Sequence, residues 1–253
     1  MSCHAPYKRV VVKLSGESFC RADDDAPGRE ESSGPHQRIH AAALGRLVAE
    51  IGALADAGVQ TAVVVGAGNI LRGRTLREAP IHRTTADAMG MLATLINALA
   101  LRDALEAAGR SARVLSARVV EGFCEPFSRD RALAALAGGR VVLFAAGTGH
   151  PFFTTDTAAA LRAGEIGADL LIKATQVDGV FDADPVGNPG AHKYERLSFA
   201  RALAEEVGVM DLTAIVLCRD NNIPIRVVQL CKGGSLLRAA RGEDVGTLVD
   251  ADG

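Results

Sequence analysis

The chain has 253 residues, of which 48% are hydrophobic and 23% are charged, so it can bury a substantial core and is not a disordered chain. Its 28 basic and 30 acidic residues give a formal net charge of -2. This balance excludes a general nucleic-acid binder, because such proteins present a strongly basic surface.

Short β-branched runs alternate with longer segments of helical periodicity, which is typical of an α/β protein with a largely parallel sheet. In chain order the pattern predicts a strand at 9–14, a helix at 39–57, a strand at 59–65, a helix at 84–108, a strand at 111–116, a helix at 128–136, a strand at 140–146, a helix at 156–165, a strand at 169–175, helices at 198–206 and 212–221, a strand at 224–230, a helix at 235–241 and a strand at 246–250. Most of these strands are apolar on both faces. We therefore expect a three-layer αβα sandwich with a central, mainly parallel sheet.

One segment differs in composition from the rest of the chain. Residues 21–37, RADDDAPGREESSGPHQ, combine charge with glycine and proline and lack large apolar residues, which predicts a flexible insertion after the first strand. No other segment has the composition of a linker, and no repeat is present, so we expect a single domain over 1–253. The predicted helix at 84–108 has an apolar face broad enough for a buried or interface helix.

The cysteines and the N-terminal residues indicate a cellular location. The five cysteines are far apart and form no CxxC pair, so neither a disulfide framework nor a zinc site is expected. Lys13 interrupts the first apolar stretch, and no apolar run approaches the roughly 18 residues that cross a bilayer. These features predict a cytoplasmic protein that does not insert into a membrane.

Four predicted strands end in turns rich in glycine or hydroxyl side chains. The turns are KLSGES at 13–18, GAGNILRG at 66–73, AGTGHPFFTTD at 146–156 and KATQVDGVFDADP at 173–185. Ligands of an open parallel sheet bind beyond the carboxyl ends of its strands, so we expect the turns to form one site. Glycine lets backbone N–H groups approach an anion closely, which predicts a negatively charged ligand.

Lysine is scarce, which makes its positions informative. Only five of the 28 basic residues are lysines, and two of them, Lys13 and Lys173, stand at predicted strand ends beside these turns. Arg72 follows the second turn, so three cations lie near glycine-rich loops. Each feature alone has a simpler explanation, such as a tight corner, a solvent-facing lysine or, for Asp156, a helix cap. Together they favour a phosphate-binding site.

Several common motifs are absent. The chain has no Gly-Lys dipeptide, which excludes a Walker A loop, and Leu71 stands where a dinucleotide-binding fingerprint has its third glycine. GxSxG and HExxH do not occur, and the six histidines lack metal-ligand spacing.

The combined motifs resemble the bacterial UMP kinases of the amino acid kinase superfamily. The resemblance extends from Tyr7 to Val249, through YKRVVVKLSGES, VVVGAGNILRG, ADAMGMLATLINALALRDAL, GTGHPFFTTD, LLIKATQVDGVFDADP, VMDLTAIVLCRDNNIPIRV and GTLV. DxMGMLAT together with GTGxPFFTTD separates these enzymes from the carbamate, acetylglutamate and aspartate kinases that share the fold. The resemblance implies transfer of the γ-phosphoryl group of ATP to UMP, with Mg²⁺, in pyrimidine nucleotide biosynthesis.

The resemblance also implies catalytic roles. Lys13 and Lys173 are expected to hold the transferred phosphoryl group from opposite sides, with Asp156 between them. Arg72 is expected to contact phosphate between donor and acceptor. The acceptor is an ionised phosphate oxygen, so no general base is needed. Asp211 matches an acidic position tied to catalysis or metal, and a helix N-cap is the alternative explanation for it.

Two sets of binding residues follow from the same resemblance. The ATP set is Lys13, Leu14, Ser15, Gly16, Gly68, Arg72, Thr175, Phe181 and Asp184. The UMP set is Ala67, Arg72, Asp87, Thr148, Gly149, His150, Pro151, Phe152, Phe153, Thr154 and Thr155.

The chain departs from the family pattern in three places. Ala67 replaces a glycine of the family's GGGN, and alanine is compatible there if its φ is negative. His150 replaces an asparagine, and its larger imidazole can still donate one hydrogen bond. Residues 21–37 replace a shorter loop associated with GTP activation.

Regulation and assembly are further expectations from the resemblance. The family forms hexamers, so a homohexamer is expected, with GTP as a candidate activator and UTP as a candidate inhibitor. Positions near the family's regulatory site correspond to Arg102, Asp103, Arg113 and Arg140. Each of these could equally be an ordinary surface or helix-end charge.

Two alternatives remain open. A related kinase acting on a carboxylate or carbamate is one, although PFFTTD and Asp87 argue against it. A metal-oxide storage protein or a regulator that binds ATP without turnover is the other, and the intact Lys13, Lys173 and Asp156 favour catalysis over binding alone.

Overall fold

A computed structural model describes residues 7–20, 39–71, 80–185, 187–188, 190–230 and 233–253. The predicted insertion at 21–37 and Arg72 lie outside the described residues. Phe19 and His40 flank that insertion, and the N–H of His40 donates to the carbonyl of Phe19 at 2.8 Å. The described chain therefore leaves and re-enters the fold at adjacent points.

The centre of the protein is a nine-stranded sheet with the order β4-β3-β5-β2-β1-β6-β10-β11-β9. All neighbouring strands are parallel except β10 and β11, which confirms the predicted mainly parallel sheet. The strands are β1 (Arg9–Leu14), β2 (Gln60–Val65), β3 (Ala112–Ser116), β4 (Glu125–Pro126), β5 (Val141–Ala145), β6 (Leu170–Thr175), β9 (Arg196–Ser198), β10 (Ile225–Gln229) and β11 (Thr247–Asp250). A separate antiparallel pair consists of β7 (Val180–Phe181) and β8 (Lys193–Tyr194).

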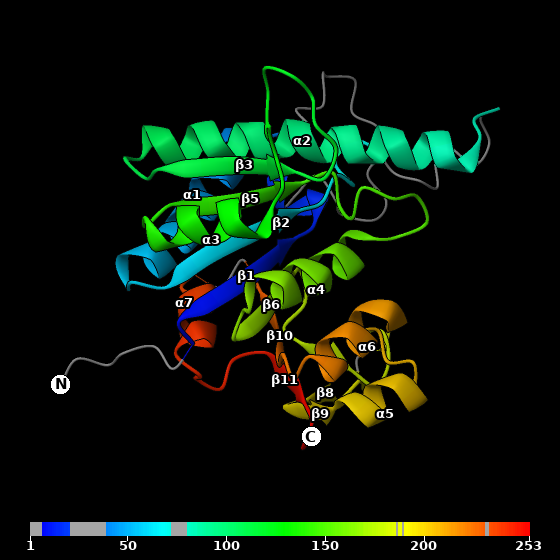
Figure 1. Cartoon of the computed structure of the whole chain (residues 1–253). Coiled ribbons are helices and arrows are strands. Elements are labelled where there is room, and N and C mark those ends of the chain that lie inside the picture. The colour runs from blue at the N-terminus through cyan, green and yellow to red at the C-terminus, as the bar shows by residue number, and fades with distance from the viewer. Residues whose placement is uncertain (1–6, 21–38, 72–79, 186, 189, 231–232) are drawn as a thin grey trace.

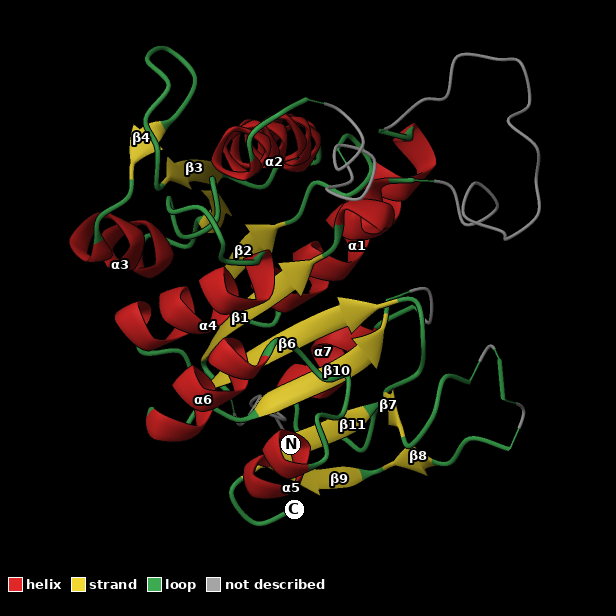
Figure 2. Cartoon of the chain, turned by 90° about the vertical axis from the view of Figure 1, so that its right-hand side faces the viewer, coloured by secondary structure: helices red, strands yellow, loops and turns green. Residues whose placement is uncertain are grey.

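Helices cover both faces of this sheet (Figures 1 and 2). One face carries α1 (Ala41–Asp56), α2 (Arg83–Ala107) and α7 (Ser235–Ala240), and the other carries α3 (Arg129–Ala137), α4 (Thr155–Ile166), α5 (Phe199–Ala204) and α6 (Leu212–Asp220). Strand β1 serves both cores, because successive side chains point to opposite faces. Val10, Val12 and Leu14 pack towards the α1 side, whereas Val11 packs towards the α4 side.

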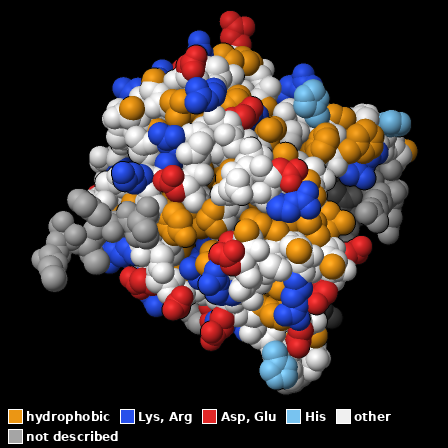
Figure 3. All heavy atoms as spheres, turned by 60° about the horizontal axis from the view of Figure 1, so that its bottom comes forward, with side chains coloured by type: hydrophobic (Ala, Val, Ile, Leu, Met, Phe, Trp, Pro, Cys, Tyr) orange, Lys and Arg blue, Asp and Glu red, His pale blue; other side chains and the backbone are white. Residues whose placement is uncertain are grey.

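Every predicted helix and strand is present, with boundaries shifted by a few residues. The strands β4, β7, β8 and β9 and the 3-10 helix η1 (Gly16–Phe19) were not predicted. Strands of two or three residues are too short to show a periodic pattern. The face shown in Figure 3 has acidic and basic side chains interspersed, as the near-balanced charge predicts.

Helix α2 has a buried side and an exposed apolar side. Leu101 and Leu105 are fully buried against the sheet, whereas Met89, Leu92 and Ile96 are 36%, 54% and 51% exposed. We call these three exposed residues the α2 stripe. Among the described helices only α2 is long and apolar enough to cross a membrane, a property that core helices of soluble proteins share. Because one side packs on the sheet, we interpret α2 as a core helix with an apolar outer stripe.

The turns that follow β1 and β2 touch each other. A Cβ atom added to Gly16 would lie 2.1 Å from the backbone nitrogen of Gly68 and 2.6 Å from that of Asn69. The N–H of Gly66 also donates to the carbonyl of Leu14 at 2.8 Å. Glycine at position 16 is therefore required by the close approach of the two turns, which brings two of the predicted loops to one place.

We expect Gly16→Ala to lower the free energy of unfolding by about 1–3 kcal/mol, because the methyl group overlaps backbone that cannot rotate away. Gly45 is the matched control: it lies inside α1 with no atom within 4 Å of an added Cβ. Gly45→Ala should raise the free energy of unfolding by about 0.8–1 kcal/mol through helix propensity. Denaturant unfolding measures both variants, and a Gly16→Ala protein as stable as the parent would contradict the packing.

Candidate active site

Two lysines stand side by side at the ends of the central strands. Lys13 on β1 and Lys173 on β6 are direct partners in the parallel register, so their side chains leave the same face of the sheet. Asp156, in the first turn of α4, lies above them. Lys13 Nζ is 2.9 Å from Asp156 Oδ1, and Lys173 Nζ is 3.0 Å from Asp156 Oδ2. The juxtaposition expected from the sequence is present, while the catalytic roles remain predictions.

The carboxylate of Asp156 is largely buried between these charges. Burial alone would raise its pKa, but the ammonium groups of Lys13 and Lys173 outweigh burial and lower the pKa below its ordinary value. Only the Lys173 contact has hydrogen-bond geometry, and Oδ1 accepts no hydrogen bond from the described residues. The ammonium of Lys13 nevertheless lies against Oδ1, so each carboxylate oxygen faces one positive charge. Lys173 Nζ also donates to the carbonyl of Val209 at 2.6 Å.

Asp156 is not the cap of its helix. The N-cap of α4 is Thr154, whose hydroxyl accepts from the N–H of Asp156 at 3.0 Å and from that of Thr157 at 3.2 Å. The explanation of Asp156 as merely a helix cap is thus wrong. Its side chain is free of capping contacts and can act on the lysines.

Asp211 is the N-cap of α6. Its carboxylate accepts from the N–H of Ala214 at 2.8 Å, from the Thr157 hydroxyl at 2.9 Å and from the Thr154 hydroxyl. These bonds fasten the start of α4 to α6, so the capping explanation of Asp211 is confirmed. The described residues hold no group of three or more acidic, histidine or cysteine side chains suited to a metal ion. A metal role for Asp211 gains no support from this geometry.

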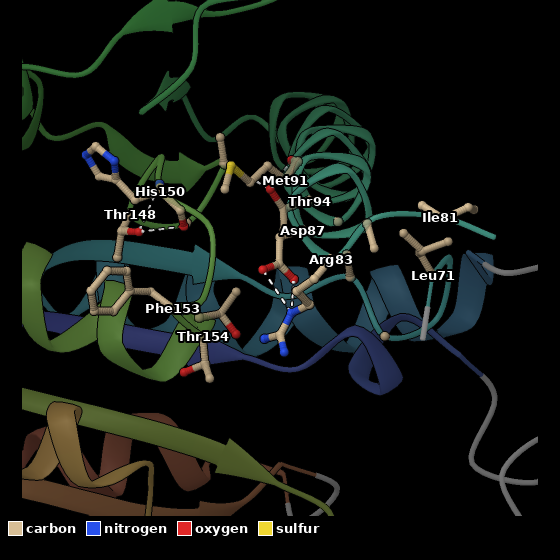
Figure 4. Close-up of a pocket in the computed structure, with 17 residues that line it drawn as sticks. Leu71, Ile81, Arg83, Asp87, Met91, Thr94, Thr148, His150, Phe153 and Thr154 are labelled. Atoms are coloured by element: carbon tan, nitrogen blue, oxygen red, sulfur yellow. Dashed lines mark hydrogen bonds and ion pairs between the residues drawn. The ribbon is translucent and has the colours of Figure 1, made fainter. Parts of the chain in front are cut away.

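Figure 4 shows a pocket of about 660 Å³. Its lining includes Thr154 and Thr155, which directly precede Asp156 in the chain. Helix α2 forms one wall and the loop after β5 forms the other, with the turn after β2 between them. The predicted UMP residues in its lining are Ala67, Asp87, Thr148, His150, Phe153, Thr154 and Thr155. Gly149, Pro151 and Phe152 belong to the same loop but not to the lining, and Arg72 lies outside the described residues.

Asp87 is already engaged by protein groups. It accepts from Arg83 Nε at 3.0 and 3.1 Å and from the backbone N–H of Phe152 at 2.8 Å. The Arg83 guanidinium also lies 5.5 Å from the centre of the Phe152 ring. Asp87 therefore joins α2 to the opposite wall of the pocket. Ala67 has no positive φ, so the condition for replacing glycine there is met.

The predicted ATP residues lie on both sides of the lysine pair along the sheet edge. Ser15, Gly16 and Gly68 occupy the two touching turns, and the side chain of Leu14 is fully buried, so only its backbone can reach a ligand. The remaining three follow Lys173. Thr175 ends β6 and donates to the carbonyl of Val177 at 2.7 Å, Phe181 lies on β7, and Asp184 is exposed beyond it.

Some pocket residues were not predicted. Arg83, Met91 and Thr94 line the pocket from the first half of α2, away from any strand-end turn. Their spacing from Asp87, at four, four and seven positions along the helix, places them on one face. Following that face from Asp87 would have identified them in the sequence.

Asn97, one turn beyond Thr94, fastens α2 to the turn after β2. Its side-chain amide donates at 2.8 Å both to the carbonyl of Gly66 and to the side chain of Asn69, which donates back at 3.1 Å. Both asparagines are buried. The glycine turn thus has a fixed position relative to the helix.

A second hollow of about 450 Å³ lies near β3 and β4 and is lined by Arg102, Arg113 and Arg140, among others. Three of the four predicted regulatory residues are thus gathered in one place. Asp103, the fourth, pairs with Arg102 at 2.7 Å, and Arg113 pairs with Glu125 at 2.5 Å.

Comparisons with known proteins agree with this arrangement. The profile of the amino acid kinase family matches residues 8–229. A uridylate kinase of Methylococcus capsulatus is 52% identical over 243 residues, which cover 96% of this chain and 97% of the relative.

Solved structures show the same likeness. A UMP kinase from Bacillus anthracis superposes with a TM-score of 0.89 at 36% identity, covering 98% of both chains. A UMP kinase from Ureaplasma parvum gives 0.85 at 34% identity, covering 96% of this chain and 98% of the other. A uridylate kinase from Archaeoglobus fulgidus gives 0.70 at 30% identity, covering 95% and 99%.

Asp156→Asn removes the negative charge between the two lysines, and we expect it to lower the free energy of unfolding at pH 7 by about 3 kcal/mol or more. The pKa of Asp156 is lowered from its ordinary value of 3.8, so its stabilisation is complete above that value and is lost as the pH falls below it. The difference in the free energy of unfolding between Asp156→Asn and the parent should therefore stay constant from about pH 5 to 8 and shrink below about pH 4.

Denaturant unfolding of both proteins across this pH range measures the difference. Asp103→Asn is the control, because its carboxylate pairs with Arg102 at the surface, and it should change the free energy of unfolding by less than about 1 kcal/mol. Equal stability of Asp156→Asn and the parent at pH 7 would contradict the proposed stabilisation.

Proposed function

The chain belongs to the amino acid kinase family, and from that membership we propose that it is a uridylate kinase, which transfers the γ-phosphoryl group of ATP to UMP and releases UDP and ADP. The observation that carries the proposal is the contact of two ammonium groups with one carboxylate, at 2.9 and 3.0 Å, beside a pocket of nucleotide size. A site of this kind suits a reaction in which negative charge moves between two phosphates.

The proposed phosphoryl transfer depends on the positioning of the substrates and on charge stabilisation more than on covalent catalysis. In phosphoryl transfer the charge spreads over the oxygens of the migrating group, and preorganised cations stabilise it. Lys13 and Lys173 supply those cations from adjacent strands. Asp156 limits their mutual repulsion and fixes their positions. A phosphate acceptor is ionised at neutral pH, so no residue is required to remove a proton.

We assign the pocket between α2 and the loop after β5 to the acceptor nucleotide. Asp87 and the hydroxyls of Thr148 and Thr155 offer polar contacts for a nucleoside, and the positive end of the α4 dipole favours its phosphate. His150, in place of the family's asparagine, keeps one hydrogen-bond donor at the rim. The touching turns after β1 and β2 then receive the donor phosphates.

A divalent cation accompanies kinase reactions, and we propose that it is Mg²⁺ carried on the ATP phosphates. Magnesium in such sites is held by one or two carboxylates together with phosphate oxygens. The residues present fit this arrangement, because the Asp156 carboxylate is an oxygen ligand of the right kind, and the described chain has no dedicated cluster of metal ligands. When bound, the cation neutralises charge on the phosphates.

Two other functions can be separated from this one by a panel of acceptors. ADP release that depends on UMP supports the proposal, and comparison with CMP, dUMP and TMP defines the base that is accepted. ADP release with amino acids or carbamate instead would indicate a different kinase of the family. Binding of ATP without turnover would indicate a storage or regulatory protein.

Lys173→Met tests the mechanism. We expect kcat for UMP phosphorylation to fall at least about a hundredfold, or about 2.7 kcal/mol, because a charge-stabilising contact in the transition state is lost. Lys8→Met is the control, since Lys8 is exposed at the opposite end of β1 and should retain the parent rate. Circular dichroism checks that both variants fold, and near-normal turnover by Lys173→Met would remove this lysine from the mechanism.

We further propose that the protein assembles as a homohexamer and works in the cytoplasm. The α2 stripe supports assembly, because Met89, Leu92 and Ile96 form an exposed apolar surface along one helix. The free thiols of Cys124 and Cys218 are consistent with a reducing compartment.

Leu92→Glu places a charge in the centre of the α2 stripe and should reduce the mass seen by sedimentation relative to the parent, because burying an unpaired carboxylate opposes association. Ala42→Glu adds the same charge to an exposed position of α1 and should leave the mass unchanged. A parent protein that sediments only as a monomer would contradict the assembly.

We also propose that GTP activates and UTP inhibits the enzyme, with the arginine-lined hollow near β3 as the candidate site for GTP. Arg102, Arg113 and Arg140 give it the positive charge that a triphosphate requires. Activity is expected to rise during a titration with GTP at constant ATP and UMP. Unchanged activity across the titration would contradict activation by GTP. The test is needed because residues 21–37 differ from the loop that is associated with GTP activation in the family.

A further inference from the structure

The loop after β5 has an unusual backbone. Within residues 146–152, four residues have positive φ: Ala146 (60°), Gly147 (56°), Gly149 (82°) and Phe152 (73°). Glycine adopts such angles without strain, but alanine and phenylalanine do so only where surrounding contacts hold them. Ala146 also lines the acceptor pocket.

Both strained residues are held by the same helix. The N–H of Ala146 donates to Thr94 Oγ1 at 2.7 Å, and the N–H of Phe152 donates to Asp87 Oδ2 at 2.8 Å. Positions 87 and 94 are two helical turns apart and therefore lie on one face of α2. Asp87 is among the predicted UMP residues, whereas Thr94 has no role in the proposed function so far.

The Thr94 hydroxyl is oriented for this contact. It donates to the carbonyl of Met91 at 2.7 Å, a bond that threonine often makes inside a helix. That bond directs the remaining lone pairs of Oγ1 outward, where Ala146, 52 positions along the chain, donates to it. Thr94 is only 4% exposed, so water does not readily replace it as the acceptor.

Ala146 begins the turn that presents Thr148. The N–H of Gly149 donates to the carbonyl of Ala146 at 2.9 Å and closes the turn, and the Thr148 hydroxyl accepts from the N–H of His150 at 3.2 Å. Arg118 Nε donates to the carbonyl of Gly149 at 2.8 Å. The turn is thus held at its two ends, by Thr94 and by Arg118.

We propose that Thr94 is a positioning residue for the acceptor nucleotide: its hydroxyl holds Ala146 in the left-handed conformation and so directs Gly147 and Thr148 into the pocket. This inference rests on the proposed function, in that the pocket receives the acceptor. Loss of the hydroxyl would leave the N–H of Ala146 buried without an acceptor, and the turn would relax away from the nucleotide.

Thr94→Val tests the inference, because valine has the same shape without the hydroxyl. We expect the KM for UMP to rise at least about tenfold, while the KM for ATP changes less than about twofold. Thr94→Ser keeps the hydroxyl and should retain most of the affinity for UMP. Thr61→Val is the matched control: Thr61 is 2% exposed on β2, its hydroxyl donates to Val59 at 3.0 Å, and its loss should leave both KM values unchanged.

A second substitution separates positioning from direct contact with UMP. Glycine adopts a positive φ without strain, so Ala146→Gly added to Thr94→Val should lower the KM for UMP back towards the parent value. An unchanged KM for UMP in Thr94→Val, a parallel rise in the KM for ATP, or no recovery in the double variant would each overturn the inference.

Amide hydrogen exchange tests the same contact without any substrate, so its result does not depend on which acceptor the enzyme uses. The amides of residues 146–149 should exchange faster in Thr94→Val than in Thr61→Val, and equal exchange would overturn the inference. A parent protein that does not phosphorylate UMP would refute the proposed function but would leave this measurement intact.

Discussion

The structure depends on one carboxylate that lies between two ammonium groups. Lys13 and Lys173 are neighbours across a parallel strand pair, so the sheet itself brings two positive charges together. Such a pair is unfavourable in a largely buried place unless an opposite charge accompanies it. Asp156 supplies that charge from the first turn of α4, and the cap at Thr154 and the bonds to Asp211 fix where α4 begins. This cluster of charges is therefore a property of the packing of α4 on β1 and β6.

The pocket between α2 and the loop after β5 is assembled in a similar way, by side chains that restrain the backbone. Helix α2 contacts the loop after β5 through Asp87 and Thr94, and it contacts the turn after β2 through Asn97. Glycine permits the close approach of the turns after β1 and β2, and these polar contacts then hold the loops in place. A binding site made of loops thereby acquires the rigidity of the helix.

The sequence predicted those parts of the site that are local in the chain. Lys13 and Lys173 could be identified because lysine is scarce and both follow apolar runs, and the glycine turns because they end strands. The hydrogen bonds that Thr94 and Asn97 make could not be predicted, because their partners are more than 25 positions away and nothing in a helical pattern marks a side chain that bonds a distant backbone. The short strands β7 and β8 were missed because a pair of residues has no periodicity. The sequence also could not decide the role of Asp211, since an acidic residue before a helix is compatible with a helix cap as well as with a metal ligand.

The hydrogen bond between the N–H of His40 and the carbonyl of Phe19 bears on which changes of length the chain tolerates. It joins residues on either side of 21–37, so it sets the distance between η1 and α1 whatever the length of the chain between them. Closing a loop twice as long costs only about 0.6 kcal/mol more in entropy. Insertions, deletions or a grafted peptide are therefore tolerated there far more readily than inside β1, where adding a single residue would turn Lys13 to the wrong face of the sheet.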